Sequence, residues 1–166
     1  RFQPIRSFLG KVDAPRWPLS QSLFQRLDTL HTAGLSLGGF AREQVRVDTV
    51  SQQVCFWPSE TCAQSHQETK GYRKGGYLCI PQTLTQKAAD CGWPLDGQIR
   101  DLFSAAVLSF YLLFFTHPFV GSAYWSLMRE SYKVQYQNYP DYIFDPEGNN
   151  HLGFLDFEQE ILKQWN

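Results

Sequence analysis

A long uncharged stretch in the second half of the chain constrains the fold more than any other feature. No Asp, Glu, Lys or Arg occurs at the 27 consecutive positions from Leu102 to Met128. The first 14 of these residues, Leu102–Phe115, are apolar except for Ser104 and Ser109. An uncharged stretch of this length must be weighed as a membrane-spanning helix.

Two observations favour a helix in a protein core over a membrane span. A helix of 14 residues is only about 21 Å long, against a hydrocarbon core of about 30 Å. His117 and Pro118 would also fall near the middle of the stretch, where polar groups cost most. We therefore expect a central core helix that Asp96 caps and that ends near Phe115. Membrane insertion of residues 102–128 is the alternative.

The first half of the chain shows a helical pattern followed by strand patterns. Apolar residues recur at helical spacing from Leu19 to Leu30, and Gly34 provides a stop. Residues 40–57 are rich in Val and aromatic side chains, which predicts two strands joined by a turn at 48–52. The other expected segments are an irregular arm at 1–18 with one short ordered piece, a loop at 58–76 and a third strand at 77–80. A short helix is expected next, capped by Thr83 or Thr85 and ending near Gly92.

These patterns predict an α+β fold. The expected architecture is a small antiparallel sheet of two or three strands packed on a mainly helical C-terminal half, with one buried central helix. Two further helices are expected at 122–138 and 154–165. The length suits a single domain over residues 1–166. Because the chain begins with Arg1, we expect it to be processed or cut from a longer chain.

The charge is balanced in total but uneven along the chain. Fifteen Lys and Arg oppose sixteen Asp and Glu, which argues against a duplex nucleic acid as partner. Residues 1–50 have seven basic and four acidic side chains, whereas residues 101–166 have three and eight. Six of those eight acids follow Pro140. The acidic end predicts either a surface for a basic partner or a simply solvated surface.

Four cysteines, Cys55, Cys62, Cys79 and Cys91, fall within one stretch. No two of them have the close spacing that structural zinc sites use, so we expect no zinc. Disulfide bonds and reduced thiols both fit the number of cysteines. The absence of an N-x-S/T sequon favours a cytoplasmic protein over a secreted or periplasmic one.

Aromatic side chains gather just after the uncharged stretch. Tyr132, Tyr136 and Tyr139 follow helical spacing, Tyr142 comes next, and Trp125 precedes them. Several tyrosines on one helical face are typical of a half-buried boundary, because each hydroxyl needs water or a polar partner. We expect these five residues to form a surface that binds another protein. Core packing on an amphipathic helix is the alternative.

Residues that could support catalysis are present without an intact motif. Cys62 and His66 lie in a loop with basic neighbours, which can lower the pKa of a thiol. His117 opens a His-Pro-Phe sequence that matches the first three positions of the loop of Fic-type AMP-transferring enzymes. Gly121 and Trp125 replace the acid and the arginine of that loop, so the sequence does not predict that family. A histidine at a helix end is the simpler interpretation of His117.

An acidic segment near the C-terminus has the spacing of a calcium loop. Asp145, Glu147, Asn149 and Asp156 place oxygen atoms at alternating positions, with Asp156 as the twelfth residue. Pro146 at the second position argues against a calcium site, and an acidic turn before a helix is the alternative. We predict no cofactor.

Together these features favour a non-catalytic interaction module that uses its aromatic surface and its acidic C-terminal region. The alternative is a small hydrolase or transferase that depends on Cys and His. Its site would lie between the loop at 59–76 and the late helices.

Overall fold

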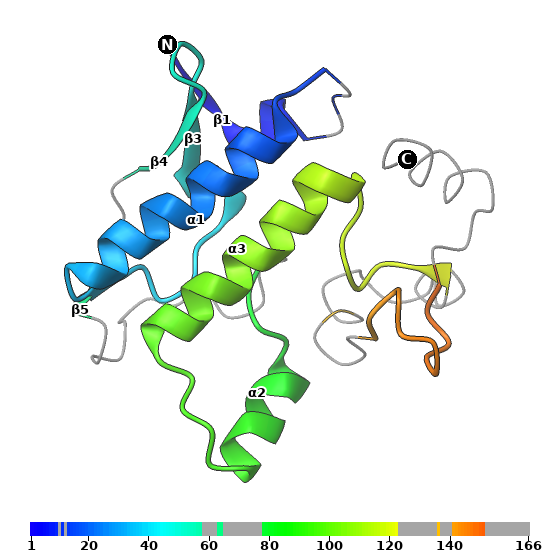
Figure 1. Ribbon diagram of the computed structural model, residues 1–166. Helices are drawn as coiled ribbons and strands as arrows, with labels where there is room; N and C mark the ends of the chain where they lie inside the picture. Colours follow the sequence, from blue (N-terminus) through cyan, green and yellow to red (C-terminus); the bar gives the residue numbers. More distant parts are fainter. Residues whose placement is uncertain are drawn as a thin grey trace.

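The fold is α+β, with two antiparallel helices packed beside a small antiparallel sheet (Figure 1). A computed structural model describes residues 1–9, 11, 13–57, 63–64, 78–122, 136 and 141–151. The elements in chain order are β1 (Phe2–Pro4), η1 (Ile5–Ser7), α1 (Arg16–Thr32), β2 (Leu35–Ser36), η2 (Arg42–Gln44), β3 (Val45–Asp48), β4 (Gln53–Phe56), β5 (Ala63–Gln64), α2 (Gln82–Asp90) and α3 (Gly97–Phe114).

Helix α1 confirms the first predicted helix and begins three residues earlier than expected. Pro18 lies in its first turn, where a missing backbone N–H breaks no helical hydrogen bond. Leu19, Leu23 and Leu27 are buried on one face. The helix gives way to Gly34 in the left-handed conformation, with φ of 74°, as the sequence indicates.

The three-stranded sheet has the order β1-β3-β4 and is antiparallel throughout. Strands β2 and β5 pair in a separate two-stranded antiparallel sheet, so β5 is a short strand within the segment predicted as a loop. Strands β3 and β4 and the turn between them confirm the prediction for residues 40–57. The third strand is β1, which lies in the arm that was expected to be irregular apart from one short ordered piece. Residues 78–80 are not a strand, so that prediction is wrong. Strand β1 is short and gains its structure from pairing with β3, 42 to 46 residues away, which no local pattern reveals.

The register of β3 and β4 explains how α1 meets the sheet. Trp57 N donates to Gln44 O (2.7 Å), which makes this pair hydrogen-bonded. Because such pairs alternate along an antiparallel ladder, the backbone groups of Val54 point away from β3. The Val54 N–H donates to Ser22 Oγ of α1 at 2.8 Å. A serine on the buried side of α1 therefore satisfies an edge donor of the sheet.

Helix α2 ends just before Gly92, as predicted, and follows Pro81 directly. Neither expected threonine caps it. Thr85 Oγ1 instead donates to the Pro81 carbonyl at 3.0 Å. Pro81 is the N-cap residue of α2 and has an extended backbone conformation, which is typical of a residue just before a helix.

Helix α3 is the predicted central helix. Asp96 Oδ1 accepts from Ile99 N at 2.9 Å, so the predicted cap is confirmed. The face toward α1 is buried and includes Ala105, Leu108 and Leu112, whereas Leu102 on another face is exposed. Figure 1 shows α1 and α3 side by side with opposite directions. Among the described helices, none is long and apolar enough to cross a bilayer.

A buried carboxylate holds the turn after β2 against α3. Asp101 accepts from Leu37 N (2.8 Å), Gly39 N (2.7 Å) and His31 Nε2 (3.0 Å). Burial raises the pKa of Asp101 above its ordinary value, although the Gly39 N–H, His31 and the Leu37 N–H each act to lower it. The carboxylate joins α1, α3 and the turn at one point.

The two predicted late helices lie almost wholly outside the described residues. Of the range 122–138, the structure describes Ser122 and Tyr136 as helical, and the range 154–165 lies outside it.

Candidate aromatic binding surface

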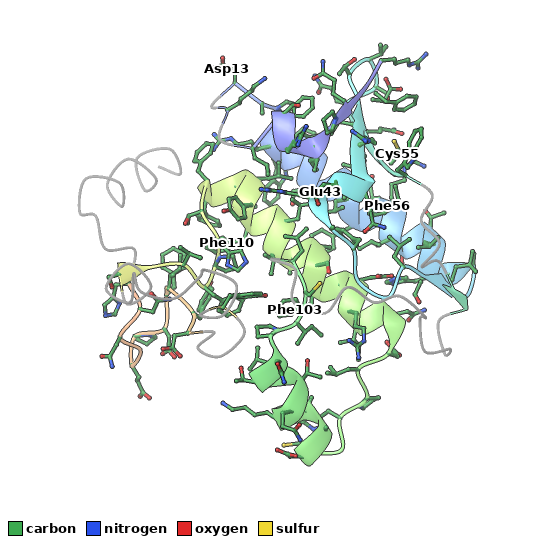
Figure 2. All side chains as sticks on the ribbon, turned by 180° about the vertical axis from the view of Figure 1, so that it is seen from behind. Asp13, Glu43, Cys55, Phe56, Phe103 and Phe110 are labelled. Atoms are coloured by element: carbon green, nitrogen blue, oxygen red, sulfur yellow. The ribbon has the colours of Figure 1, made fainter. Side chains whose placement is uncertain are left out.

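Four aromatic side chains form a continuous cluster at the C-terminal end of α3. We call Phe110, Phe114, Tyr142 and Phe144 the aromatic patch. The ring centroids of Phe110 and Phe114 are 4.5 Å apart, and Phe144 lies 5.9 Å from Phe110 and 6.0 Å from Phe114. Tyr142 lies 5.8 Å from Phe144 with its ring nearly perpendicular, an edge-to-face geometry. Figure 2 shows Phe110 on the side of α3 that faces residues 141–150.

Local spacing explains why these four rings meet. Phe110 and Phe114 are one helical turn apart and therefore share a face of α3. Tyr142 and Phe144 flank Ile143, whose side chain is buried. The Ile143 N–H donates to the Pro118 carbonyl at 2.9 Å, which holds this segment against the turn after α3.

Asn150 provides a second anchor for the same segment. Its Nδ2 donates to the Asp141 carbonyl at 2.7 Å and to the Phe119 carbonyl at 3.2 Å. Asn150 is itself buried. The buried side-chain amide of Asn150 thus holds the two ends of the segment to each other and to the turn after α3.

Much of the patch faces solvent. Tyr142 is 42% exposed and Phe144 is 43% exposed, while Phe110 and Phe114 are half-buried. The exposure of Tyr142 and Phe144 has a cost, because each ring loses part of the free energy that burial would provide. Clustered exposed aromatic side chains are typical of protein-binding sites.

Three exposed acids adjoin the patch: Asp141, Asp145 and Glu147. Residues 141–151 contain no Lys or Arg, so this segment is uniformly acidic. Asp145 Oδ1 accepts from Glu147 N at 3.0 Å, and the Asp145 carbonyl accepts from Gly148 N at 3.1 Å. These contacts form a turn that fixes the acids next to Phe144 in sequence and in space.

The five residues predicted to bind a partner have different positions. Tyr142 belongs to the exposed patch. Tyr136 is buried, with 2% of its surface exposed, and its hydroxyl donates to the Cys79 carbonyl at 2.6 Å. Tyr136 therefore packs inside the protein and does not present its ring to a partner. Trp125, Tyr132 and Tyr139 lie outside the described residues, so their role stays a prediction.

His117, a predicted catalytic candidate, lies in an aromatic environment and is fully buried. Its Nδ1 accepts from the Phe119 N–H at 3.2 Å, so this nitrogen carries no proton. The ring packs against Tyr136 at 4.8 Å and Tyr111 at 5.8 Å, both edge-to-face. These contacts place His117 as a link between α3 and Tyr136.

The other catalytic candidates, Cys62 and His66, lie outside the described residues. Among the described residues, no disulfide joins Cys55, Cys79 and Cys91. The alternative of an enzyme that depends on Cys and His stays a prediction.

Of the predicted calcium ligands, Asp145, Glu147 and Asn149 are exposed on the turn described above, and Asp156 lies outside the described residues. In the described part of the chain, no three His, Cys, Asp or Glu side chains gather closely enough to hold a metal. Calcium binding was only the weaker interpretation of this segment, and with Asp156 outside the described residues it stays untested.

Sequence reasoning missed Phe110, Phe114 and Phe144 as surface residues. The two on α3 lie in an apolar helix, where phenylalanine is read as core. Hydrophobic periodicity cannot distinguish a helix face that a neighbouring helix covers from a face that stays open. By contrast, Tyr142 lies close in sequence to the acids of residues 141–147, and this proximity does indicate a surface segment.

The chain matches no protein-family model, and no curated protein matches its sequence.

Proposed function

We propose that this protein is a non-catalytic interaction module that binds a segment of another protein through the aromatic patch and the acids beside it. The single observation that carries the proposal is the contact of the exposed rings of Tyr142 and Phe144 with the half-buried rings of Phe110 and Phe114. A partner that covers these rings would recover the free energy lost by their exposure, about 25 cal/mol for each Å² of apolar surface buried.

The chemistry of the partner follows from the composition of this surface. Its apolar centre suits aromatic or aliphatic side chains, and the rings of Tyr142 and Phe144 also offer faces to a cation. Asp141, Asp145 and Glu147 favour Lys or Arg at the edge of the contact. We therefore infer a partner segment with apolar side chains flanked by basic ones. Added salt should weaken its binding, because the charged contacts lie at the exposed edge.

A selection from a library of random peptides tests this function directly. Peptides that bind the full chain should be enriched in Lys or Arg next to aromatic or aliphatic residues. Phe144→Ala should weaken binding of the selected peptides by about tenfold to thirtyfold, the loss expected for an aromatic residue central to an interface. Fluorescence anisotropy with a selected peptide measures this change.

Trp93→Ala is the matched control. Trp93 is also exposed, but it lies in the segment between α2 and α3. Its replacement should leave the affinity unchanged. Thermal unfolding of both variants checks that they fold. Selected peptides that bind wild type and the Phe144→Ala variant equally, or that lack basic residues, would contradict the proposal.

A further inference from the structure

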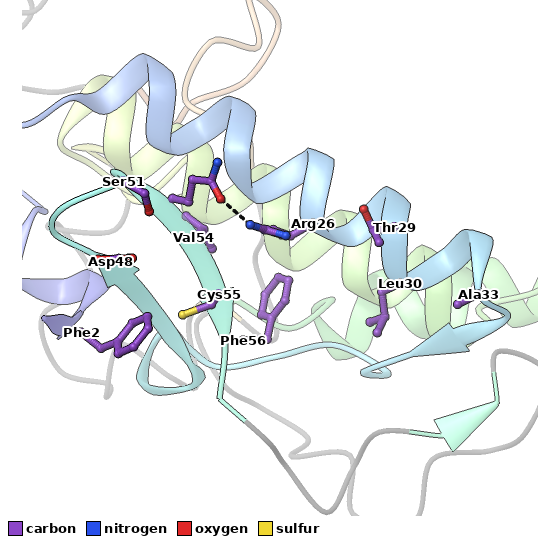
Figure 3. Close-up of a pocket in the computed structure, with 11 residues that line it drawn as sticks. Phe2, Arg26, Thr29, Leu30, Ala33, Asp48, Ser51, Val54, Cys55 and Phe56 are labelled. Atoms are coloured by element: carbon purple, nitrogen blue, oxygen red, sulfur yellow. Dashed lines mark hydrogen bonds between the residues drawn. The ribbon is translucent and has the colours of Figure 1, made fainter.

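A second candidate site lies on the opposite part of the fold, between α1 and β4. A cavity of about 580 Å³ opens there, a size within the range of small-molecule pockets. Figure 3 shows Phe2 and Asp48 at one end and Leu30 and Ala33 at the other, with Cys55 and Phe56 between them. The other lining residues are Arg26, Thr29, Ser51, Gln53 and Val54.

The lining is apolar along most of its length. Phe2, Leu30 and Phe56 supply aromatic and aliphatic surface from three separate elements. The Phe56 ring also packs against Phe40 at 5.1 Å, so part of this wall is continuous with the core. Such a wall suits the hydrocarbon part of a ligand.

Two charged side chains line the cavity, Arg26 and Asp48, and Asp48 is already paired with another arginine. Asp48 is the one carboxylate in its lining, and the Arg1 Nε lies 3.1 Å from Asp48 Oδ1. The hydrogen bond from Arg1 is the main cause that lowers the pKa of Asp48 from 3.8 to about 2. Asp48 therefore stays ionised and paired at neutral pH, and it contributes little net negative charge to the cavity.

Arg26 has no such partner. Its guanidinium donates to the neutral side chain of Gln53, as Figure 3 shows, and no carboxylate pairs with it among the described residues. Arg46 adds a further positive charge nearby, because both Arg26 and Arg46 act to lower the pKa of the Cys55 thiol. Burial, the largest cause, and Asp48 nevertheless raise the pKa of that thiol. An arginine with free N–H donors beside an apolar wall suits an amphipathic anion.

We propose that this cavity binds a small amphipathic carboxylate, with its hydrocarbon part against Phe2, Leu30 and Phe56 and its anionic group on Arg26. The proposal is independent of the proposed function, because the cavity and the aromatic patch share no residue.

The Cys55 thiol provides a built-in reporter for the test, with octanoate as the probe. Cys55 lines the cavity and is half-buried, whereas Cys91 follows α2, is exposed and lies outside the cavity. The full chain is labelled with iodoacetamide at about pH 8.5, where an ordinary thiol is half ionised. Peptide mapping by mass spectrometry follows each cysteine separately. At an octanoate concentration of ten times its Kd, labelling of Cys55 should slow by about tenfold, while Cys91 keeps its rate.

Two comparisons make the test specific for charge and place. Octylammonium has the same tail with the opposite charge and should protect Cys55 at least about fivefold less well. Arg26→Gln should weaken octanoate binding by about fivefold to tenfold. Arg42→Gln is the matched control, because Arg42 is also exposed but pairs with Glu43 outside the cavity.

Three results would overturn the proposal. The first is unchanged Cys55 labelling at all octanoate concentrations below micelle formation. The second is equal slowing of Cys55 and Cys91, which would mean nonspecific binding. The third is protection that Arg26→Gln leaves intact.

Discussion

At the scale of single residues, buried polar side chains hold the elements in place. Ser104 Oγ donates to the Leu78 carbonyl at 2.8 Å and accepts from the Phe40 N–H at 3.3 Å. The hydroxyls of Ser109 on α3 and Ser20 on α1 contact each other. These are the two serines that interrupt the apolar run of α3, and each connects that helix to a distant segment.

Asp101 is fully buried, and its carboxylate accepts hydrogen bonds from three donors. In Asp101→Ala, the buried N–H of Leu37 and the half-buried N–H of Gly39 lose their acceptor, and His31 loses its partner. We expect the free energy of unfolding to fall by about 3 kcal/mol. Unfolding in urea, followed by circular dichroism, measures the change.

Asp28→Ala is the control for this substitution. Asp28 is exposed on α1, so its loss should change stability by no more than about 0.5 kcal/mol. Equal effects of the two substitutions would mean that the Asp101 hydrogen bonds contribute no net stability.

At the scale of elements, the sequence was informative wherever local pattern decides structure. The spacing of leucines in α1, the turn between β3 and β4 and the Asp96 cap all follow from residues close in sequence. Strand β1 escaped prediction because only its pairing with β3 makes it a strand. Likewise, the sequence did not predict the buried hydrogen bonds of Asp101, because its partners lie 62 to 70 residues away.

The first residue of α3, Gly97, lies very close to strand β2. A Cβ added to Gly97 would overlap Ser36 Oγ and lie 2.9 Å from Ser36 Cβ, in strand β2. Glycine to alanine in a helix usually stabilises by up to about 1 kcal/mol. Here we expect Gly97→Ala to lower the free energy of unfolding by about 1–3 kcal/mol, because the overlap forces the two elements apart. Chemical denaturation measures the sign.

A second substitution identifies the cause. Ser36 Oγ is buried and, among the described residues, has no hydrogen-bond partner. Ser36→Ala removes this hydroxyl and should itself be neutral or stabilising by up to about 1 kcal/mol. The double variant should be more stable than Gly97→Ala alone. Strict additivity of the two effects would rule out the overlap as the origin of the loss.

At the scale of the whole molecule, two groups of contacts meet at α3. One is the apolar core between α1, the sheet and α3, and the other is the aromatic cluster around His117. The sequence predicted the α+β class and the position of the central helix. It could not show which face of α3 stays open, since that depends on how segments distant in sequence pack. The aromatic patch lies on that open face.

Tyr136 joins these two groups through one buried hydrogen bond. Its hydroxyl donates to the carbonyl of Cys79, 57 residues away, at 2.6 Å. Tyr136→Phe keeps the ring contacts with His117 but leaves this carbonyl without that donor. We expect a loss of about 1–2 kcal/mol in the free energy of unfolding, measured by urea denaturation.

The Tyr142→Phe variant is the control. It shows how much stability is lost when the hydroxyl of an exposed tyrosine is removed. Tyr142 is in the aromatic patch and its exposed side can be hydrated, so Tyr142→Phe should change stability by no more than about 0.5 kcal/mol.

The Cys79 thiol adds a local readout, because it is buried next to the carbonyl that Tyr136 binds. If the hydrogen bond holds the two groups together, Cys79 should react with iodoacetamide faster in Tyr136→Phe and at the wild-type rate in Tyr142→Phe. Equal stability and equal Cys79 labelling in the two variants would show that ring packing alone joins the two groups.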